Sequence, residues 1–154
     1  MVTRASLGRV FPIVRPTPMT LLPARVWGQE QWERIERGYR ARCMEEKWNV
    51  FVENRVAFMH RSWTGYGVFE ASFSPIDGGW QISSAVVESS LKRGPNASAQ
   101  LNRVLLELVL SAIVLGEPAS ELRAELVRRS LPKDRPAPPD GLIEFSILGL
   151  RSDT

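Results

Sequence analysis

The chain has 154 residues, of which 44% are hydrophobic and 24% charged, and its formal net charge is +3 at pH 7. That length fits one domain with a substantial core, and the composition excludes a wholly disordered chain. The single cysteine, Cys43, excludes an internal disulfide framework and favours a reducing compartment. No apolar run is long enough to span a bilayer, so a cytoplasmic protein with no membrane partner is expected.

The first part of the chain is rich in arginine and proline. Residues 1–42 hold eight arginines against three glutamates, and four prolines lie among the first 26 residues. Proline removes backbone donors and disfavours helix, so residues 1–26 are predicted to form an extended basic arm. The arginines are scattered among apolar residues without an aromatic–basic RNA-binding motif, so nucleic acid is not expected as a partner. Met1 and Met19 are alternative start sites that the sequence does not distinguish.

The next segments predict one helix followed by four strands. Trp32, Ile35 and Tyr39 recur on one helical face and predict a helix over residues 29–42. Runs rich in β-branched and aromatic residues, separated by turn sequences such as Glu53-Asn54, predict strands over 48–53, 55–60, 66–73 and 80–87. The short connections favour antiparallel pairing, because parallel strands need long crossovers.

The second half of the chain is predicted to be helical and to cover the sheet. Residues 98–115 carry a wide apolar stripe and a narrow polar one, and a shorter helix is predicted over 118–129. The members of the polar stripe are Gln100, Arg103, Glu107 and Ser111. Gly94-Pro95-Asn96 separates this half from the strands, and residues 132–140 form a proline-rich linker before a last strand or docked tail at 142–150.

The expected architecture is α+β, with a four- to five-stranded antiparallel meander packed on one face by two to three helices. In this reading the arm of residues 1–26 precedes a single α+β domain over residues 27–131. Residues 132–154 then hold the proline-rich linker and the docked C-terminal strand or tail.

One stretch gathers groups that are suited to binding. At the end of a predicted strand, and just before two glycines, stand His60, Arg61, Ser62, Trp63 and Thr64. Arginine and histidine pair with phosphate or carboxylate, hydroxyls donate hydrogen bonds, and a tryptophan ring offers a flat face for a base. The same residues also suit a plain turn between two strands. In that case His60 shares a strand face with Val56 and Phe58, and the tryptophan packs under the helix.

Motifs for other chemistry are absent from the sequence. One histidine and one cysteine cannot form a zinc site, and there is no Walker loop or dinucleotide-binding glycine motif. A triad of Ser62, His60 and Asp77 has no supporting spacing. The adjacent Glu45 and Glu46 are expected to be solvated. No metal and no cofactor is therefore expected.

The middle of the chain resembles a known family of small bacterial domains whose function is uncharacterised. The resemblance lies within Trp32–Val87 and rests on the order Glu46-Lys47-Trp48, Phe51 and Glu53, followed by the hexapeptide HRSWTG that begins at His60. It covers about a third to a half of the chain, and the hexapeptide is its specific part. Some members of that family are joined to ADP-ribose-processing domains such as macrodomains or ADP-ribosylglycohydrolases. The resemblance implies an association with ADP-ribose or NAD metabolism and no established activity.

These observations predict an accessory or ligand-binding module, with ADP-ribose or a related nucleotide as its ligand. In this interpretation Arg61 contacts phosphate, Trp63 stacks on a base, and the side chains of His60, Ser62 and Thr64 donate hydrogen bonds. Two alternatives stay open. One is a protein–protein interaction module without a small ligand, and the other is an enzyme that uses His60 as acid or base.

Overall fold

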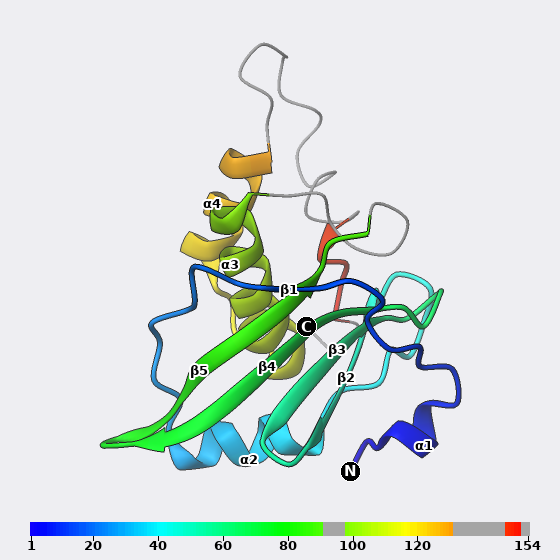
Figure 1. Ribbon diagram of the computed structural model, residues 1–154, viewed down its shortest axis with the longest axis horizontal. Coiled ribbons are helices and arrows are strands. Elements are labelled where there is room, and N and C mark those ends of the chain that lie inside the picture. The colour runs from blue at the N-terminus through cyan, green and yellow to red at the C-terminus, as the bar shows by residue number, and fades with distance from the viewer. Residues whose placement is uncertain (91–97, 131–146, 152–154) are drawn as a thin grey trace.

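The computed structural model describes residues 1–90, 98–130 and 147–151, which form one sheet with helices packed against it (Figure 1). The elements, in chain order, are α1 (Arg4–Leu7), β1 (Pro16–Pro18), α2 (Gln29–Arg37), β2 (Trp48–Glu53), β3 (Val56–Arg61), β4 (Gly67–Ile76), β5 (Gly79–Glu88), α3 (Ala99–Leu108), the π-helix η1 (Val109–Val114) and α4 (Ser120–Ser130). Among the described residues, no helix is long and apolar enough to cross a membrane.

The five strands form one antiparallel sheet in the order β1-β5-β4-β3-β2. From β2 to β5 each strand pairs with the next along the chain, so the predicted meander is confirmed. The turn between β2 and β3 consists of Asn54 and Arg55, whose φ values are 51° and 65°. Two positive φ values define a type I′ hairpin, whose twist matches the twist of the flanking strands. The turn lies one residue later than predicted, because Glu53 still pairs with Val56.

Helices α2, α3 and η1 pack on one face of the sheet, as the sequence predicts for an α+β fold (Figure 1). That face buries large side chains from the four long strands, among them Trp48, Met59, Phe69 and Ile82. On α2, Trp32 stacks on Trp80 of β5 with 4.6 Å between the ring centroids. Burial of such rings is the main favourable contribution to folding, because each removes a large apolar area from water.

The first predicted helix ends five residues early, at Arg37. Gly38 follows with a left-handed φ of 75°, and this turn allows Tyr39 to pair with Val50 of β2. A Cβ atom on Gly38 would lie 2.4 Å from the carbonyl oxygen of Val50, so only glycine fits here. The close pairing with β2 therefore ends the helix.

The second predicted helix changes its hydrogen-bonding pattern at Val109. From there to Val114 the chain is π-helical, and the amide of Leu115 donates to the carbonyl of Leu110, 3.0 Å away. The wider turn shifts the side chains around the axis relative to an α-helix. Ser111 was predicted on the polar stripe, but it is fully buried and accepts a hydrogen bond from Arg25.

The N-terminal residues lie against the sheet rather than projecting from it. Arg4 makes a two-pronged ion pair with Glu53 and sits over the rings of Phe51 and Phe58, on the face that the helices leave open. Its segment is the short helix α1, where an extended chain was predicted. Farther on, β1 pairs with β5 and becomes the fifth strand of the sheet.

A buried carboxylate anchors this N-terminal segment. Glu88, at the end of β5, is fully buried, and its side-chain oxygens accept hydrogen bonds from the amides of Val14 and Arg15 at 2.6 and 3.0 Å. The amide of Ser89 then donates to the carbonyl of Arg15. Charge-assisted hydrogen bonds of this kind are stronger than neutral ones and hold the segment to the strand end.

At the other terminus, the described part of the predicted tail is docked on the fold. Leu148 is fully buried, Gly149 forms an isolated bridge with Glu46, and the amide of Leu150 donates to the carbonyl of Glu45. The proline-rich linker at 132–140, residues 142–146 of the predicted tail and the turn at residues 94–96 lie outside the described residues.

Replacing Glu88 with Ala is expected to lower the free energy of unfolding by roughly 2–3 kcal/mol and to loosen the N-terminal segment. The reason is that the substitution removes the charge-assisted bonds to the backbone amides of Val14 and Arg15. Urea denaturation measures the first effect, and limited proteolysis between Arg9 and Arg15 measures the second. Ser89→Ala removes only one hydroxyl bond to the Arg15 carbonyl and serves as the control. Equal protease resistance in Glu88→Ala and the parent would contradict the anchoring role.

Candidate functional site

The hexapeptide HRSWTG covers the end of β3 and most of the turn that leads to β4. The amide of Arg61 donates to the carbonyl of Tyr66, and the amide of Gly65 donates back to the carbonyl of Arg61, at 2.9 and 2.8 Å. Gly65 has a φ of 76°, and a Cβ atom there would lie 2.6 Å from the carbonyl oxygen of Arg9. The turn therefore needs this glycine, both for its conformation and for the close approach of the N-terminal chain.

His60 is part of the framework of this turn. Its ring is 3% exposed, stacks on Phe51 at 5.6 Å, and places Nδ1 2.9 Å from the carbonyl oxygen of Gly65. Burial lowers the pKa of the imidazole below its ordinary value of 6.5, and the hydrogen bond to Gly65 only partly opposes that shift. The ring shares the helix-free face with Phe58, as the structural interpretation of the sequence predicts.

Arg61 also points into the fold. Its guanidinium lies over the Trp48 ring at 4.8 Å and donates to the carbonyl of Ile147, 2.7 Å away, in the docked C-terminal segment. The Trp48 indole donates to the same carbonyl at 3.1 Å. Burial lowers the pKa of this guanidinium. Arg61 thus tethers the C-terminal segment to β3.

The two hydroxyl residues of the turn bond to nearby backbone. Ser62 is half-buried, and its Oγ donates to the carbonyl of Glu46 at 2.7 Å while its amide donates to the carbonyl of Lys47. Thr64 is exposed, and its Oγ1 accepts from the amide of Tyr66 at 3.2 Å. These contacts shape the turn and fix the loop that precedes β2.

Trp63 differs from its neighbours because its ring faces outward. It is 55% exposed, although its Nε1 donates to the carbonyl of Met44 at 2.9 Å. The ammonium of Lys47 lies 4.3 Å from the ring centroid, which is a cation–π distance. The expectation that this ring packs under a helix is therefore wrong, since the turn holds it at the surface.

Beside this ring lies a hollow that we call the Trp63 depression, with a volume of about 400 Å³. It is formed by the end of α1, the loop before β2, one residue of β2 and the turn itself. The residues that line it are Leu7, Arg40, Ala41, Arg42, Cys43, Met44, Asn49, Ser62 and Trp63. Of the five residues that the sequence nominated, Ser62 and Trp63 line the depression, and His60, Arg61 and Thr64 do not.

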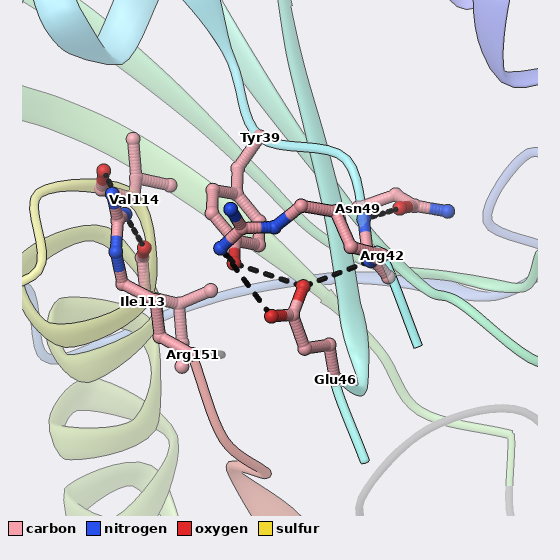
Figure 2. Close-up of polar contacts among 8 residues, drawn as sticks. Tyr39, Arg42, Glu46, Asn49, Ile113, Val114 and Arg151 are labelled. Carbon is pink, nitrogen blue, oxygen red and sulfur yellow. Dashed lines mark hydrogen bonds and ion pairs between the residues drawn. The ribbon is translucent and has the colours of Figure 1, made fainter. Parts of the chain in front are cut away.

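A buried carboxylate holds the loop that lines the depression (Figure 2). Glu46 is fully buried, and its Oε1 accepts from the Tyr39 hydroxyl and from the Arg42 amide, both at 2.9 Å. Arg42 donates from its guanidinium to the same hydroxyl. The expectation that Glu46 is solvated is wrong, because these donors replace water around the carboxylate, whereas Glu45 is exposed as expected.

The two arginines of the depression differ in their partners. Arg42 lies 3.5 Å from Glu46 and 5.6 Å from the Tyr39 ring, so its charge is partly compensated. Arg40 is exposed and has no ion-pair partner among the described residues. The depression therefore combines a flat aromatic ring with positive charge, which is the chemistry that binds an aromatic anion.

A second hollow, of about 490 Å³, lies between α3–η1 and α4 and has the opposite character. Its lining includes Glu107, Glu117, Glu121 and Glu125. Burial raises the pKa of Glu107, and Arg25 makes a two-pronged ion pair with Glu117. Anions are repelled here, and no group of histidine, cysteine or carboxylate side chains among the described residues is arranged to hold a metal ion.

Among the lining residues that the sequence did not single out, Arg40, Arg42 and Asn49 carry polar side chains suited to binding. No local motif marks them, because they reach the depression only through the turn at Gly38 and the folding of the loop before β2. For the two arginines the one sequence signal was the excess of arginine in the first 42 residues, which does not say where those side chains converge.

A comparison with known protein families, curated proteins and solved structures finds no match for this chain. The resemblance that rests on the HRSWTG hexapeptide therefore stays a prediction. Any functional conclusion depends on the geometry of the site itself.

The buried imidazole is expected to make stability depend on pH. Because the pKa of His60 is lower in the folded protein than in the unfolded chain, the unfolded chain binds a proton more readily. Stability is then full above about pH 6.5 and falls as the pH drops from that value toward the folded-state pKa. Thermal melts of the parent and of His60→Gln between pH 5 and 7.5 should show a steeper loss in the parent. Parallel curves would contradict this assignment.

Arg61→Ala is expected to lower stability rather than to affect a ligand directly. It removes a charged hydrogen bond to the Ile147 carbonyl and the contact with Trp48, which together correspond to roughly 1.5–3 kcal/mol. Chemical denaturation measures the change. Arg40→Ala is the matched control and should leave stability within about 0.5 kcal/mol, because that side chain is exposed. Equal stability of the Arg61→Ala and Arg40→Ala variants would contradict a structural role for Arg61.

Proposed function

We propose that this chain is an accessory binding module that holds a phosphate-bearing, nucleotide-like ligand, such as ADP-ribose, in the Trp63 depression. The observation that carries the proposal is the exposure of the Trp63 ring beside two arginines. The ring is fixed by its hydrogen bond to Met44 and its contact with Lys47, and much of its surface still faces water. A side chain that is already ordered loses little entropy when a base stacks on it.

The charges around the ring support an anionic ligand. A guanidinium binds phosphate through two parallel hydrogen bonds, and Arg40 is available for such contacts among the described residues. Arg42 adds positive potential although it is already bonded to Tyr39 and Glu46. An adenosine diphosphate derivative offers both a flat base and two phosphates. The volume of the depression lies within the range of small-molecule sites.

This proposal changes the binding roles that the sequence suggested for the residues of the hexapeptide. Trp63 keeps its stacking role, and the phosphate contact expected of Arg61 is assigned to Arg40. The resemblance to domains associated with ADP-ribose metabolism supports the choice of ADP-ribose as the first ligand to test. The exposed free thiol of Cys43 suits a reducing compartment, so we propose that the protein works in the cytoplasm.

Binding is favoured over acid–base catalysis by the position of the only histidine. His60 is buried and lines neither the Trp63 depression nor the acidic hollow. A general acid or base must reach the proton that it transfers, and a buried ring bonded to a backbone carbonyl is poorly placed to do so.

Trp63→Ala is expected to weaken ADP-ribose binding about tenfold to a hundredfold. Stacking of a base on an aromatic side chain is worth roughly 1–3 kcal/mol, and each 1.4 kcal/mol corresponds to about a factor of ten in affinity. Trp63→Phe should retain part of the affinity, and Arg40→Ala should weaken ADP-ribose and AMP alike. Isothermal titration calorimetry with ADP-ribose, AMP and inorganic phosphate measures these changes.

Thr64→Ala is the matched control, because Thr64 is exposed in the same turn but does not line the depression. Its affinity should equal that of the parent. Absence of binding by the parent at millimolar ADP-ribose and AMP, or binding that survives Trp63→Ala and Arg40→Ala together, would rule out the proposed site.

A further inference from the structure

A second surface is formed by the N-terminal segment Arg9–Arg15, which we call the strap. The strap crosses the end of the sheet where β3 ends and β4 begins. Its middle is pinned at Phe11, whose amide donates to the Gly65 carbonyl at 2.8 Å and whose carbonyl accepts from the Gly67 amide at 3.0 Å. Its end is pinned by Glu88, which accepts from the amides of Val14 and Arg15. The backbone of the strap is therefore rigidly placed, although it is not part of a long strand.

The strap exposes both apolar and positively charged side chains. Phe11 is 42% exposed and Val14 is 56% exposed, while Ile13 lies against Gly67. Arg9 and Arg15, at the two ends, are exposed, and among the described residues neither has an ion-pair partner. Two apolar side chains thus lie between two positive charges.

We infer that the strap is a docking surface for a partner protein. The segment of the partner that binds there is short and carries acidic residues on either side of an apolar residue. The acidic residues would pair with Arg9 and Arg15, and the apolar residue would cover Phe11 and Val14. Apolar and arginine side chains held in fixed positions are typical of the centres of protein interfaces. Because the strap residues do not line the Trp63 depression, this inference does not depend on the proposed ligand.

The same contacts favour protein over nucleic acid. Nucleic-acid binding without sequence preference uses open aromatic faces and a row of cations along the backbone. Here the Phe11 ring packs against Tyr66, with 6.0 Å between centroids and an angle of 58°, so part of its surface is already covered. Val14 has no face on which a base could stack, and it is the more exposed of the two apolar residues. An apolar side chain of a peptide suits this pair better than a base does.

The partner segment is expected to bind through its side chains and not as an added strand. The neighbouring strand β1 lies at the edge of the sheet, and two of its three residues, Pro16 and Pro18, have no backbone N–H. Proline at an edge prevents regular extension of the sheet. Specificity must therefore come from the charges and apolar groups of the strap.

The test is a selection of random dodecapeptides displayed on phage against the full chain, followed by fluorescence anisotropy with the enriched peptides. We expect enriched peptides to carry two acidic residues around an apolar stretch. The double variant Arg9→Glu, Arg15→Glu should weaken their binding about tenfold or more, because attraction becomes repulsion at both ends. Phe11→Ser should weaken it without any change in charge. The control Arg37→Glu, Arg128→Glu carries the same change of net charge at exposed sites on α2 and α4 and should bind as the parent does.

Thermal melts of every variant establish that it is folded, and Val14→Ser replaces Phe11→Ser if the latter unfolds. The inference is overturned if no peptide is enriched, if the enriched peptides lack acidic residues, or if the strap and control double variants bind equally well. Tighter binding of a single-stranded oligonucleotide than of any selected peptide, lost in the strap double variant, would also overturn it and make the strap a nucleic-acid surface.

Discussion

The buried carboxylate of Glu46 is the interaction on which one whole end of the molecule depends (Figure 2). Removing a carboxylate from water is expensive, so it persists only where donors surround it. The donors here are Tyr39 and Arg42, from the segment that follows α2. The backbone of Glu46 in turn accepts from Ser62 and pairs with Gly149. One residue thereby brings together the loop before β2, the turn after β3 and the docked C-terminal segment.

This arrangement explains why the Trp63 depression has a defined shape. The loop that lines it is held by the bond between Glu46 and the Arg42 amide, and the turn that carries Trp63 is held to the same loop by Ser62 and by the indole bond to Met44. Tyr39 is linked to the C-terminal segment as well, since Arg151 lies 5.1 Å from its ring while bonding to the carbonyl of Val114. The Trp63 ring is therefore held at the surface by polar contacts in the turn and in the neighbouring loop.

The sequence was sufficient to predict four of the five strands of the sheet. Alternation of apolar side chains and a glycine- or asparagine-containing turn at each reversal are local signals, and they located β2 to β5 to within a few residues. The fifth strand was beyond such reasoning, because β1 has three residues, two of them proline, and exists only through its pairing with Val86 to Glu88. Helix ends were set by distant contacts too, as the pairing of Tyr39 with Val50 shows.

The candidate site was predicted only in part, for a related physical reason. A run of polar and aromatic residues on a turn indicates a candidate binding site, but it does not say which of the side chains face inward. His60 and Arg61 became framework because buried partners, Phe51 and Trp48, stack on them. Glu46 was expected in water because a glutamate beside another glutamate is usually solvated. Donors to it come from Tyr39 and Arg42, and no rule of spacing links these two residues with Glu46 in advance.

The π-helix η1 has a consequence for how this chain tolerates change in length. A π-helical turn behaves as an α-helix that has accommodated one additional residue. The carbonyls at its end are used by two arginines from remote segments, Arg151 at Ile113 and Val114, and Arg34 at Leu115. Deleting one residue between Val109 and Val114 would restore the narrower α-helix with the flanking turns in register, whereas deleting one residue within α3 would turn everything beyond it by about 100°. Because Arg34 and Arg151 require the far end of the helix to keep its register, a one-residue deletion is tolerated best within η1 itself.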